Sequence, residues 1–404
     1  MKFVFFYPSR TLGGAELLLA RVAAWLHRAG EETVVVDAPG GKLAELAAAG
    51  GVPAIAVRRG SPIALSDAAI IMPSSHVVEV RRWIEPAESV RQVAWMIHPY
   101  NNVLVPFAGE FFHAHPRWMY AVNRLLLAKE YQEMGSALGY LMQKRSLVFM
   151  DDECLSKVRR WYRLPTEPEP VFLPIPLEGV FPILPPYRVP SGPLRIFCVG
   201  RLVDFKVHSL IYLAERLAAS RFRAELKLVV IGTGDQEWRV RKTLSALDID
   251  WEMRGEVQPE RLQEALREQA DVVVGMGTSA LEGARLAIPT VSIDASFRPI
   301  KGDYKFRWLF QNTGMSTGRI LDVRSALPPG MDVDELIATV RESGEEVAAR
   351  CWQYFHGNHE TAPILERLKS IARDAVDTGS LARRYPFRDG FFKAAAKRML
   401  GRGR

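Results

Sequence analysis

The stretch Gly275-Met-Gly-Thr-Ser-Ala-Leu-Glu-Gly-Ala-Arg-Leu-Ala-Ile-Pro-Thr290 is the most informative part of this 404-residue sequence. It follows the apolar run 271–274, Asp-Val-Val-Val, and leads into a second apolar run, 290–293, Thr-Val-Ser-Ile. Short apolar runs on either side of a helical segment predict a strand, a loop, a helix and another strand. This alternation is typical of a parallel sheet that is covered by helices.

The residues of this stretch point to a phosphorylated ligand. The predicted loop is Gly275-Met276-Gly277, and glycine lets a ligand approach the backbone because it has no Cβ. Thr278 and Ser279 are expected where the helix begins, so free N–H groups and the positive end of its dipole face the ligand. One turn further on, Glu282 is expected to turn its carboxylate toward a sugar hydroxyl. The stretch therefore predicts a site for a phosphorylated, hydroxyl-bearing small molecule.

A second motif upstream suits the same ligand. The segment 199–206, Val-Gly-Arg-Leu-Val-Asp-Phe-Lys, follows a predicted strand at 194–199 and leads into a predicted helix at 207–219. It places Arg201 and Lys206 at the carboxyl end of a strand, where open α/β sheets bind ligands. A guanidinium fork and a mobile ammonium group suit a diphosphate. The alternative is that both are surface cations paired with nearby carboxylates.

The rest of the chain alternates in the same way. In the first part of the chain, strands are predicted at 3–7 and 32–37 around a helix at 14–28. The stretch at 60–150 is harder to interpret. In the later part, strands are predicted at 194–199, 226–231, 249–254, 271–274 and 290–293. Residues 111–144 are expected to be mostly helical and are rich in aromatic side chains. Ten of the 26 prolines fall within 165–193, and proline disfavours helices and central strands, so this stretch predicts a linker. The fold class predicted is α/β, with two doubly wound domains.

Three motifs together resemble those of a known family. These are Gly13-Gly-Ala-Glu16, Gly200-Arg-Leu followed by Lys206, and the block from Gly275 to Pro289. In order and spacing they are similar to glycosyltransferases of the GT-B fold, of the retaining kind grouped as family 4. The resemblance implies two Rossmann-like domains that face a central cleft, an N-terminal acceptor-binding domain at 1–188 and a C-terminal nucleotide-sugar-binding domain at 189–372. Residues 373–404 would form a C-terminal helix and a basic tail.

The resemblance also implies roles for individual residues of the donor domain. Arg201 and Lys206 would bind the diphosphate of a nucleotide sugar, and Glu282 the ribose hydroxyls. The backbone near Val257 would meet the base. The family carries another Glu eight residues before the second, at the position of Val274 here, and that Glu touches the donor sugar. We interpret Val274 as a sign of a variant donor site, although it also leaves room for a protein that no longer transfers sugar.

Candidate residues of the first domain lie at two predicted strand ends. The amides of Gly13 and Gly14 could cradle an anion after the first strand. Glu16 opens the following helix, where it either stabilises the helix dipole or contacts a ligand. His98 follows the apolar run 93–97, and the resemblance implies that it contacts the donor sugar or the acceptor. The alternative for His98 is a ring held by a backbone partner. His113 and His115 are weaker candidates at a helix entry.

Composition excludes several classes of protein. Hydrophobic content of 48% and charged content of 25% are those of a globular protein, and three dispersed cysteines (Cys154, Cys198 and Cys351) argue against a disulfide scaffold or a zinc site. No apolar run is long enough to span a membrane, and no signal peptide is evident. Asp-x-Asp pairs at 248–250 and 332–334 are interpreted as structural. We predict a cytoplasmic protein without a required metal or other cofactor.

The net charge of +7 lies in the last 24 residues, because residues 1–380 hold 45 basic and 45 acidic side chains. Residues 381–404 hold eight Lys or Arg and one acid, Asp389, with apolar residues at helical spacing. Such a tail can rest on the inner, anionic face of a membrane, although a solvated tail or a packed last helix explains it equally well. Nucleic acid is not an expected partner, because a basic tail alone is weak support for it.

The function expected from this sequence is sugar transfer from a nucleotide-diphosphate sugar to a glycan or lipid-linked acceptor, with retention of configuration and in polysaccharide or glycoconjugate biosynthesis. Two alternatives remain. One is a noncatalytic GT-B protein that binds a nucleotide sugar or glycan. The other is a nucleotide-sugar epimerase on the same fold, for which no set of carboxylates or histidines is apparent.

Overall fold

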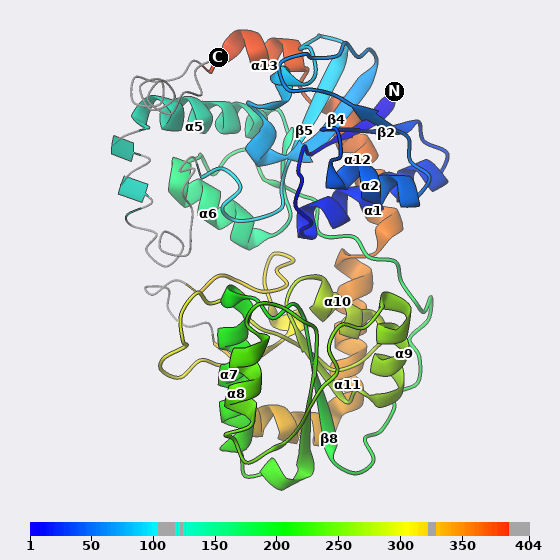
Figure 1. The fold of residues 1–404 in the computed structure, drawn as a ribbon, viewed down its shortest axis with the longest axis vertical. Helices are drawn as coiled ribbons and strands as arrows, with labels where there is room; N and C mark the ends of the chain where they lie inside the picture. Colours follow the sequence, from blue (N-terminus) through cyan, green and yellow to red (C-terminus); the bar gives the residue numbers. More distant parts are fainter. Residues whose placement is uncertain (104–117, 119, 122–123, 126, 322–328, 388–404) are drawn as a thin grey trace. The chain divides into compact units, whose positions relative to one another are not determined.

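A computed structural model describes residues 1–103, 118, 120–121, 124–125, 127–321 and 329–387 of the chain. His113, His115, part of the predicted aromatic helix and most of the basic tail lie outside these residues. The chain divides into two compact units. The first unit comprises Met1–Pro176 together with the chain from Ala362 onward, and the second unit comprises Leu177–Thr361. Each is an α/β unit built on its own sheet (Figure 1).

The first unit is built on a seven-stranded sheet in the order β3-β2-β1-β4-β5-β6-β7, in which every neighbouring pair is parallel. Its strands are short apolar runs that are mostly buried, as expected of a sheet covered on both faces, except for the exposed edge strand β3. They are β1 (Lys2–Phe6), β2 (Thr33–Asp37), β3 (Ala54–Ala56), β4 (Ala68–Pro73), β5 (Val90–Met96), β6 (Leu147–Phe149) and β7 (Val171–Phe172). The strand order reverses between β1 and β4, and at that point open α/β sheets bind ligands at their carboxyl edge.

Alternate residues of these strands supply two separate cores. One core takes residues such as Phe3, Phe5 and Trp95 and packs them against helices α1 (Gly14–Arg28), α2 (Lys42–Ala49) and α12 (Thr361–Asp374). The other takes Val4, Phe6 and their neighbours and packs them against α5 (Ala128–Gln143), α6 (Asp152–Tyr162), α13 (Thr378–Arg384) and the short helices η1 (Ser74–His76) and η2 (Val80–Arg82). Because successive side chains of a strand point to opposite faces, each strand contributes to both cores, and a layer of helices covers each face of the sheet (Figure 1).

The second unit repeats the plan with a six-stranded sheet in the order β10-β9-β8-β11-β12-β13. Five strands are parallel, and only the edge strand β13 runs antiparallel to its neighbour. The strands are β8 (Leu194–Val199), β9 (Leu226–Ile231), β10 (Asp250–Met253), β11 (Val272–Gly275), β12 (Thr290–Ser292) and β13 (Arg307–Trp308). The doubly wound fold predicted from the sequence is confirmed.

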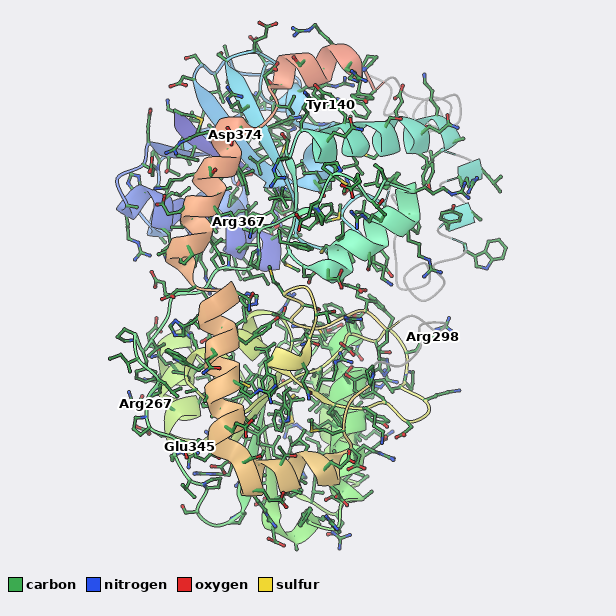
Figure 2. The ribbon with its side chains drawn as sticks, turned by 180° about the vertical axis from the view of Figure 1, so that it is seen from behind. Tyr140, Arg267, Arg298, Glu345, Arg367 and Asp374 are labelled. Carbon is green, nitrogen blue, oxygen red and sulfur yellow. The ribbon has the colours of Figure 1, made fainter. Side chains whose placement is uncertain are left out.

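Helices α7 (Asp204–Ala218) and α8 (Glu237–Leu244) lie on one side of this sheet, and α9 (Pro259–Gln269), α10 (Thr278–Arg285) and α11 (Val333–Asn358) lie on the other (Figure 1). Two short helices, η3 (Arg223–Glu225) and η4 (Leu309–Gln311), complete the unit. Helix α11 is kinked at Ser343, whose backbone is not helical, close to the labelled Glu345 (Figure 2). Its first residue follows Asp332, whose carboxylate accepts a hydrogen bond from the Glu335 amide at 2.8 Å, so Asp332 caps the helix, in keeping with the structural role expected of the pair 332–334.

The units differ from the division predicted at 188 and 372. The proline-rich stretch does carry the crossing, but the change of unit falls at Pro176 and Leu177, inside it. The chain then returns to the first unit at Ala362, because α12 buries Ile364, Leu368 and Ala372 in the core of that unit. Arg367 and Asp374 mark this helix in Figure 2. Such a return cannot be inferred from the local pattern of α12, which is only that of an amphipathic helix.

Within the described residues, no helix is both long enough and apolar enough to cross a membrane.

Candidate functional site

The two predicted cations of the second unit follow β8. Arg201 lies on the loop, as expected, whereas Lys206 was expected there too but lies in the first turn of α7, which begins at Asp204. Arg201 is exposed, whereas Lys206 is partly buried. Burial first, and then the positive charge of Arg201, lowers the pKa of Lys206 to about 8. The two cations are therefore close enough to repel each other.

Neither cation is engaged by a carboxylate in the part of the chain that the structure describes. The ion pairs of the second unit, such as Arg254 with Glu252 and Arg188 with Asp271, involve other residues. Among the described residues, the alternative of two surface cations paired with carboxylates therefore finds no support. Two neighbouring positive charges without a counterion, one of them partly buried, destabilise the unit that holds them unless an anion binds.

Glycines hold this loop against the next one. A Cβ added at Gly232 would lie 2.0 Å from the Gly200 carbonyl oxygen, and one at Gly234 would lie 2.2 Å from that of Leu202. The Leu202 amide donates to the Thr233 carbonyl at 2.8 Å. The segment Gly232-Thr-Gly234 thus serves the close packing of two loops. This packing fixes the backbone that carries Arg201.

The predicted strand, loop and helix at 271–285 are confirmed, with β11 ending at Gly275 and α10 beginning at Thr278. Gly277 has a φ of +64° with nothing within 4 Å of an added Cβ, so it provides an open turn. Gly275 has another purpose. A Cβ there would lie 2.9 Å from the backbone of Ser279 and Ala280, so this glycine lets the helix pack directly on the strand end.

The first turn of α10 faces the cation loop. A Cβ added at Gly200 would lie 3.8 Å from Lys206 Nζ and 3.9 Å from Ser279 Oγ, so ammonium and hydroxyl flank the same glycine. Arg201, Lys206 and Met276 line one small cavity. No acceptor is found among the described residues for the amides of Thr278 and Ser279, as expected for the first turn of a helix. The structure therefore brings the two motifs together into an anion-binding arrangement.

Glu282 has a partner that the sequence did not indicate. Its carboxylate forms an ion pair with Arg285 at 2.5 Å, and Arg285 also donates to the Glu178 carbonyl at 3.0 Å. Both side chains of the pair are mostly buried. Val257 packs its partly buried side chain against the core that includes Phe197. The predicted roles of Glu282 and Val257 toward ribose and base stay predictions.

A long loop after β12 completes this edge of the sheet and was missed from the sequence. The Gly277 amide donates to the Thr317 carbonyl at 2.9 Å, and Met276 packs against Gly318. The fully buried Asp294 holds the loop through two hydrogen bonds from Arg307, at 2.9 and 2.8 Å. The same loop carries Arg298 (Figure 2). Because Asp294 and Arg307 are 13 residues apart, no local pattern reveals their pairing.

A scan against protein-family models finds no match, and neither does a search of curated proteins. Solved structures do match over 92% of this chain. A glycosyltransferase from Rickettsia africae superimposes with a TM-score of 0.57 at 13% identity, over 98% of its own chain. HepE from Anabaena, crystallised with UDP, does so with a TM-score of 0.56 at 12% identity, over 99% of its chain. This chain has the GT-B fold of glycosyltransferases.

Val274, at the position where the family motif carries its first Glu, is part of the sheet of the second unit. It lies inside β11, paired with Cys198 on one side and Val291 on the other, and is 1% exposed. Its neighbour Val273 faces α10, so by strand alternation Val274 faces the α7 side of the sheet. The run Val-Val-Val at 272–274 had already indicated a buried strand, and the structure agrees. The interpretation of Val274 as a sign of a variant donor site stays a prediction.

The predicted residues of the first unit also lie at strand ends. Gly13 precedes α1, and an added Cβ there would lie 2.9 Å from the carboxylate of Glu16, which is only 3% exposed. Gly14 is exposed at the helix start. The buried carboxylate lies near Tyr7, whose pKa is raised by burial first and then by the charge of Glu16. Glu16 is thus placed beneath the glycine loop and not on its surface.

His98 is exposed directly after β5. Its Nδ1 accepts a hydrogen bond from the Tyr100 amide at 3.2 Å, while its own amide donates to Asn101 Oδ1 at 2.8 Å. The alternative expected for His98, a ring held by a backbone partner, is therefore observed: the Tyr100 amide holds the ring through Nδ1. With Nδ1 accepting, neutral His98 carries its proton on Nε2. Its contact with donor sugar or acceptor stays a prediction.

The sequence missed a second histidine in the first unit. His76 follows β4 and packs edge-on against Tyr7, with ring centroids 4.9 Å apart. Burial lowers the pKa of His76 to about 4, so the ring is neutral at neutral pH. The residue stands three positions after Pro73, the end of β4, and this position was the only local signal for it.

Proposed function

We propose that this protein is a glycosyltransferase that uses a nucleotide-diphosphate sugar and binds its diphosphate in the second unit. The observation that carries the proposal is the meeting of Lys206 Nζ and Ser279 Oγ around Gly200, next to Arg201 and the open first turn of α10. Solved relatives in fold support it, because HepE was crystallised with UDP and with UDP-glucose.

The chemistry of transfer gives each of these groups a purpose. When the sugar leaves, negative charge builds on the β-phosphate of the nucleotide. Arg201, Lys206 and the amides of Thr278 and Ser279 would stabilise that charge while it develops. Each charge-assisted hydrogen bond contributes about 1.5–3 kcal/mol. Because the cations have no carboxylate partner among the described residues, their attraction is available to the ligand.

The finer features of the proposal follow from the family resemblance. Transfer would retain the anomeric configuration, with the acceptor attacking on the face that the diphosphate leaves, and without a required metal or other cofactor. His98 would contact the reacting sugar or the acceptor, and Gly13 and Gly14 would offer their amides on the acceptor side. The acceptor would be a glycan or a lipid-linked glycan, as in polysaccharide biosynthesis. The protein would act in the cytoplasm, with its basic tail on the inner face of the membrane.

The proposal is tested in two steps. Calorimetric titration with UDP, GDP, ADP, CDP and dTDP should identify one preferred nucleoside diphosphate. The corresponding nucleotide sugars are then incubated with the protein, and nucleotide release is measured with and without a panel of glycan acceptors. Release that requires an acceptor is expected. Tight binding without release under any condition would instead favour the noncatalytic alternative, and interconversion of the sugar without release would favour the epimerase.

A further inference from the structure

A second hollow of the first unit runs along helix α5. Its residues on that helix, Tyr131, Gly135, Gly139 and Gln143, recur every four positions and so form one stripe. The opposite wall is the end of α6 and the segment 163–165 that follows it, and one end is closed by Arg384 and Tyr385. We call this hollow the α5 groove. Twelve residues of helix separate Tyr131 from Gln143, which gives the groove a length of about 18 Å.

Two glycines inside α5 create the groove. A Cβ at Gly135 would lie 3.1 Å from the Tyr162 ring, so this glycine serves close packing. Gly139 meets only one atom, Leu164 Cδ2, at 3.9 Å, so alanine would fit there. Glycine inside a helix costs about 1 kcal/mol relative to alanine. Packing explains this cost at Gly135, whereas at Gly139 the residue keeps the groove open.

The walls of the groove offer aromatic faces and neutral polar groups. The Tyr131 ring stacks on that of Tyr162, with centroids 4.9 Å apart, and Tyr140 lies on α5 beside the groove (Figure 2). The exposed side chains of Gln132, Ser136 and Gln143 add two amides and a hydroxyl. Flat apolar faces flanked by hydrogen-bonding groups suit a sugar ring, which has an apolar face and a rim of hydroxyls.

The charge of the groove is positive. Arg163 and Arg384 line it, and none of the lining residues is acidic. The guanidinium of Arg384 lies 4.9 Å from the centre of the Tyr140 ring, and its Nε donates to the Tyr385 hydroxyl at 3.3 Å. Neither arginine forms an ion pair within the described parts of the chain. Two unpaired guanidinium groups favour a ligand that carries carboxylate, sulfate or phosphate groups.

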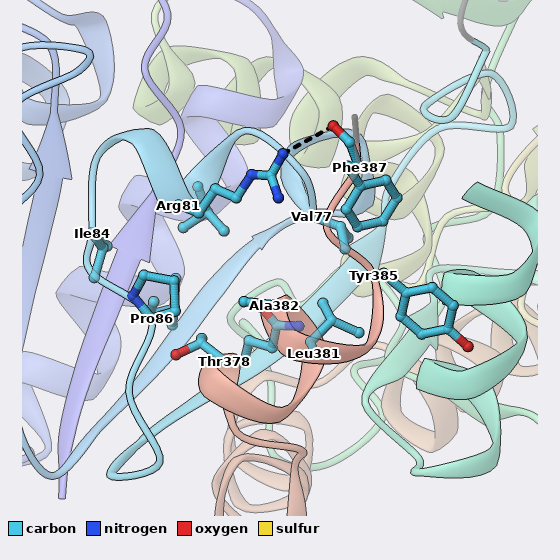
Figure 3. A pocket seen from close by; sticks show the side chains of 12 residues that line it. Val77, Arg81, Ile84, Pro86, Thr378, Leu381, Ala382, Tyr385 and Phe387 are labelled. Carbon is cyan, nitrogen blue, oxygen red and sulfur yellow. Dashed lines mark hydrogen bonds between the residues drawn. The ribbon is translucent and has the colours of Figure 1, made fainter. Parts of the chain in front are cut away.

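The closed end of the groove is held in place from behind. Arg81 donates hydrogen bonds to the carbonyl groups of Pro386 and of Phe387, the latter at 3.0 Å (Figure 3). Leu381 of α13 packs into the apolar pocket below. Tyr385 lies at the edge of that pocket (Figure 3), and its ring contacts that of Tyr140 on α5, with centroids 6.0 Å apart. The groove therefore needs little ordering when a ligand binds, and this favours affinity.

We propose that the α5 groove is a binding site for an acidic glycan, separate from the nucleotide site of the second unit. A single-stranded nucleic acid would also use aromatic faces and cations. It would need a broad basic surface, however, whereas Arg163 and Arg384 are the only basic residues among those that line the groove. The amides and the hydroxyl of the groove suit the hydroxyl groups of a sugar chain better.

The test uses the full chain on an array of uronate-, sulfate- and phosphate-bearing oligosaccharides beside neutral ones of equal length. We expect at least one acidic glycan to bind at least tenfold more tightly than its neutral counterpart. Both R163A/R384A and Gly139→Leu should weaken that binding at least tenfold. Gly139→Leu fills the groove with a better helix former, and urea unfolding of this variant separates a loss of binding from a loss of stability. Lys129→Ala with Lys144→Ala removes two exposed charges of the same helix region and should change nothing.

Three results would overturn the proposal. The first is that acidic and neutral glycans bind equally well, or that neither binds. The second is that acidic glycans still bind R163A/R384A. The third is that a dT12 oligonucleotide or phosphatidylglycerol vesicles bind more tightly than any glycan and depend on the same two arginines. Affinity for the preferred nucleoside diphosphate, measured on the same samples, should not change in any of these variants. If the α5 groove does not bind an acidic glycan, the proposed function is therefore unaffected. If the proposed function is wrong, the groove can still bind an acidic glycan.

Discussion

The two units place very different chemistry on the same scaffold. Each has a parallel sheet whose first strand lies centrally, and each presents loops at the carboxyl ends of its strands. In the second unit this edge carries two cations without a carboxylate partner among the described residues, beside an open helix start. In the first unit the corresponding edge carries a neutral histidine, His76, a buried carboxylate, Glu16, and the exposed ring of His98.

This difference shows that the fold supplies the position of a site and the loops supply its chemistry. An edge with free positive charge attracts a diphosphate. An edge of neutral rings and one carboxylate suits a ligand rich in hydroxyl groups, such as a glycan acceptor. The division of labour proposed for this protein follows from these two sets of loops, and it is open to direct tests.

The largest effect is expected from the removal of both cations. R201A/K206A deletes two charge-assisted contacts, each about 1.5–3 kcal/mol, so affinity for the preferred nucleoside diphosphate should fall at least a hundredfold. Calorimetric titration measures it. The control, K242A/R261A, removes the same charge from exposed positions of the same unit and should bind as the wild type does. If R201A/K206A binds the nucleoside diphosphate as tightly as the wild type, the two cations do not bind the diphosphate, and the proposed difference between the two sheet edges is wrong.

Lys206→Met should stabilise the protein although it weakens ligand binding. The folded state lowers the pKa of Lys206 from 10.5 to about 8, so at pH 7 it holds a charge that the unfolded chain tolerates better. The lowered pKa corresponds to a loss of about 1–3 kcal/mol in the free energy of unfolding below pH 8, where Lys206 is charged in both states. This loss becomes smaller as the pH rises toward 10.5, because Lys206 is then neutral in the folded state. Urea unfolding at pH 7 should show the gain, and at pH 10.5 most of it should be gone. A destabilised variant would mean that Lys206 serves the fold and not a ligand.

Gly275→Ala and Gly283→Ala should separate the site from its packing. A Cβ at Gly275 would press on the backbone at Ser279 and Ala280, and one at Gly283 would lie 2.6 Å from Val273 Cβ, further along the same helix. Both should lower stability by about 1–3 kcal/mol because of overpacking. Only Gly275→Ala shifts the first turn, so it alone should lose diphosphate affinity, by about tenfold or less. Equal losses of affinity in the two variants would show that the first turn of α10 is not the contact.

The smallest effect is expected in the first unit. His98→Ala removes an exposed ring whose Nε2 is proposed to reach the sugar or the acceptor, and one such hydrogen bond corresponds to about a tenfold fall in turnover. Affinity for the nucleoside diphosphate should not change, because that ligand is assigned to the other unit. Steady-state kinetics and calorimetry on the same preparation separate the two quantities. Loss of diphosphate affinity with unchanged turnover would reverse the proposed division.

Many of the helices and strands could be predicted because local sequence patterns determine them. Predicted strands at 194–199 and 226–231 coincide with β8 and β9, and the helix predicted at 14–28 coincides with α1. Short apolar runs ended by glycine define such elements without reference to the rest of the chain. The meeting of the two motifs of the second unit was also predictable, because parallel strands place their carboxyl ends at one edge.

What the sequence did not reveal depends on contacts between distant residues. The return of α12 to the first unit, the pairing of Asp294 with Arg307, and the partner of Glu282 all require knowledge of what packs where. Val274 carries both kinds of signal. A motif aligned on Glu282 gave it a ligand position, whereas the strand pattern gave it a buried one, and the structure places it in β11 with 1% exposure. What its place in the motif means for a donor sugar stays a prediction, because that depends on a ligand and not on the strand pattern.

The most direct test of the central claim is a crystal structure of the protein with its preferred nucleoside diphosphate. The account predicts β-phosphate oxygens within hydrogen-bond distance of Lys206 Nζ and of the Ser279 amide, with the Arg201 guanidinium closing on the same group. A diphosphate bound elsewhere, with Arg201 and Lys206 directed to solvent, would contradict it.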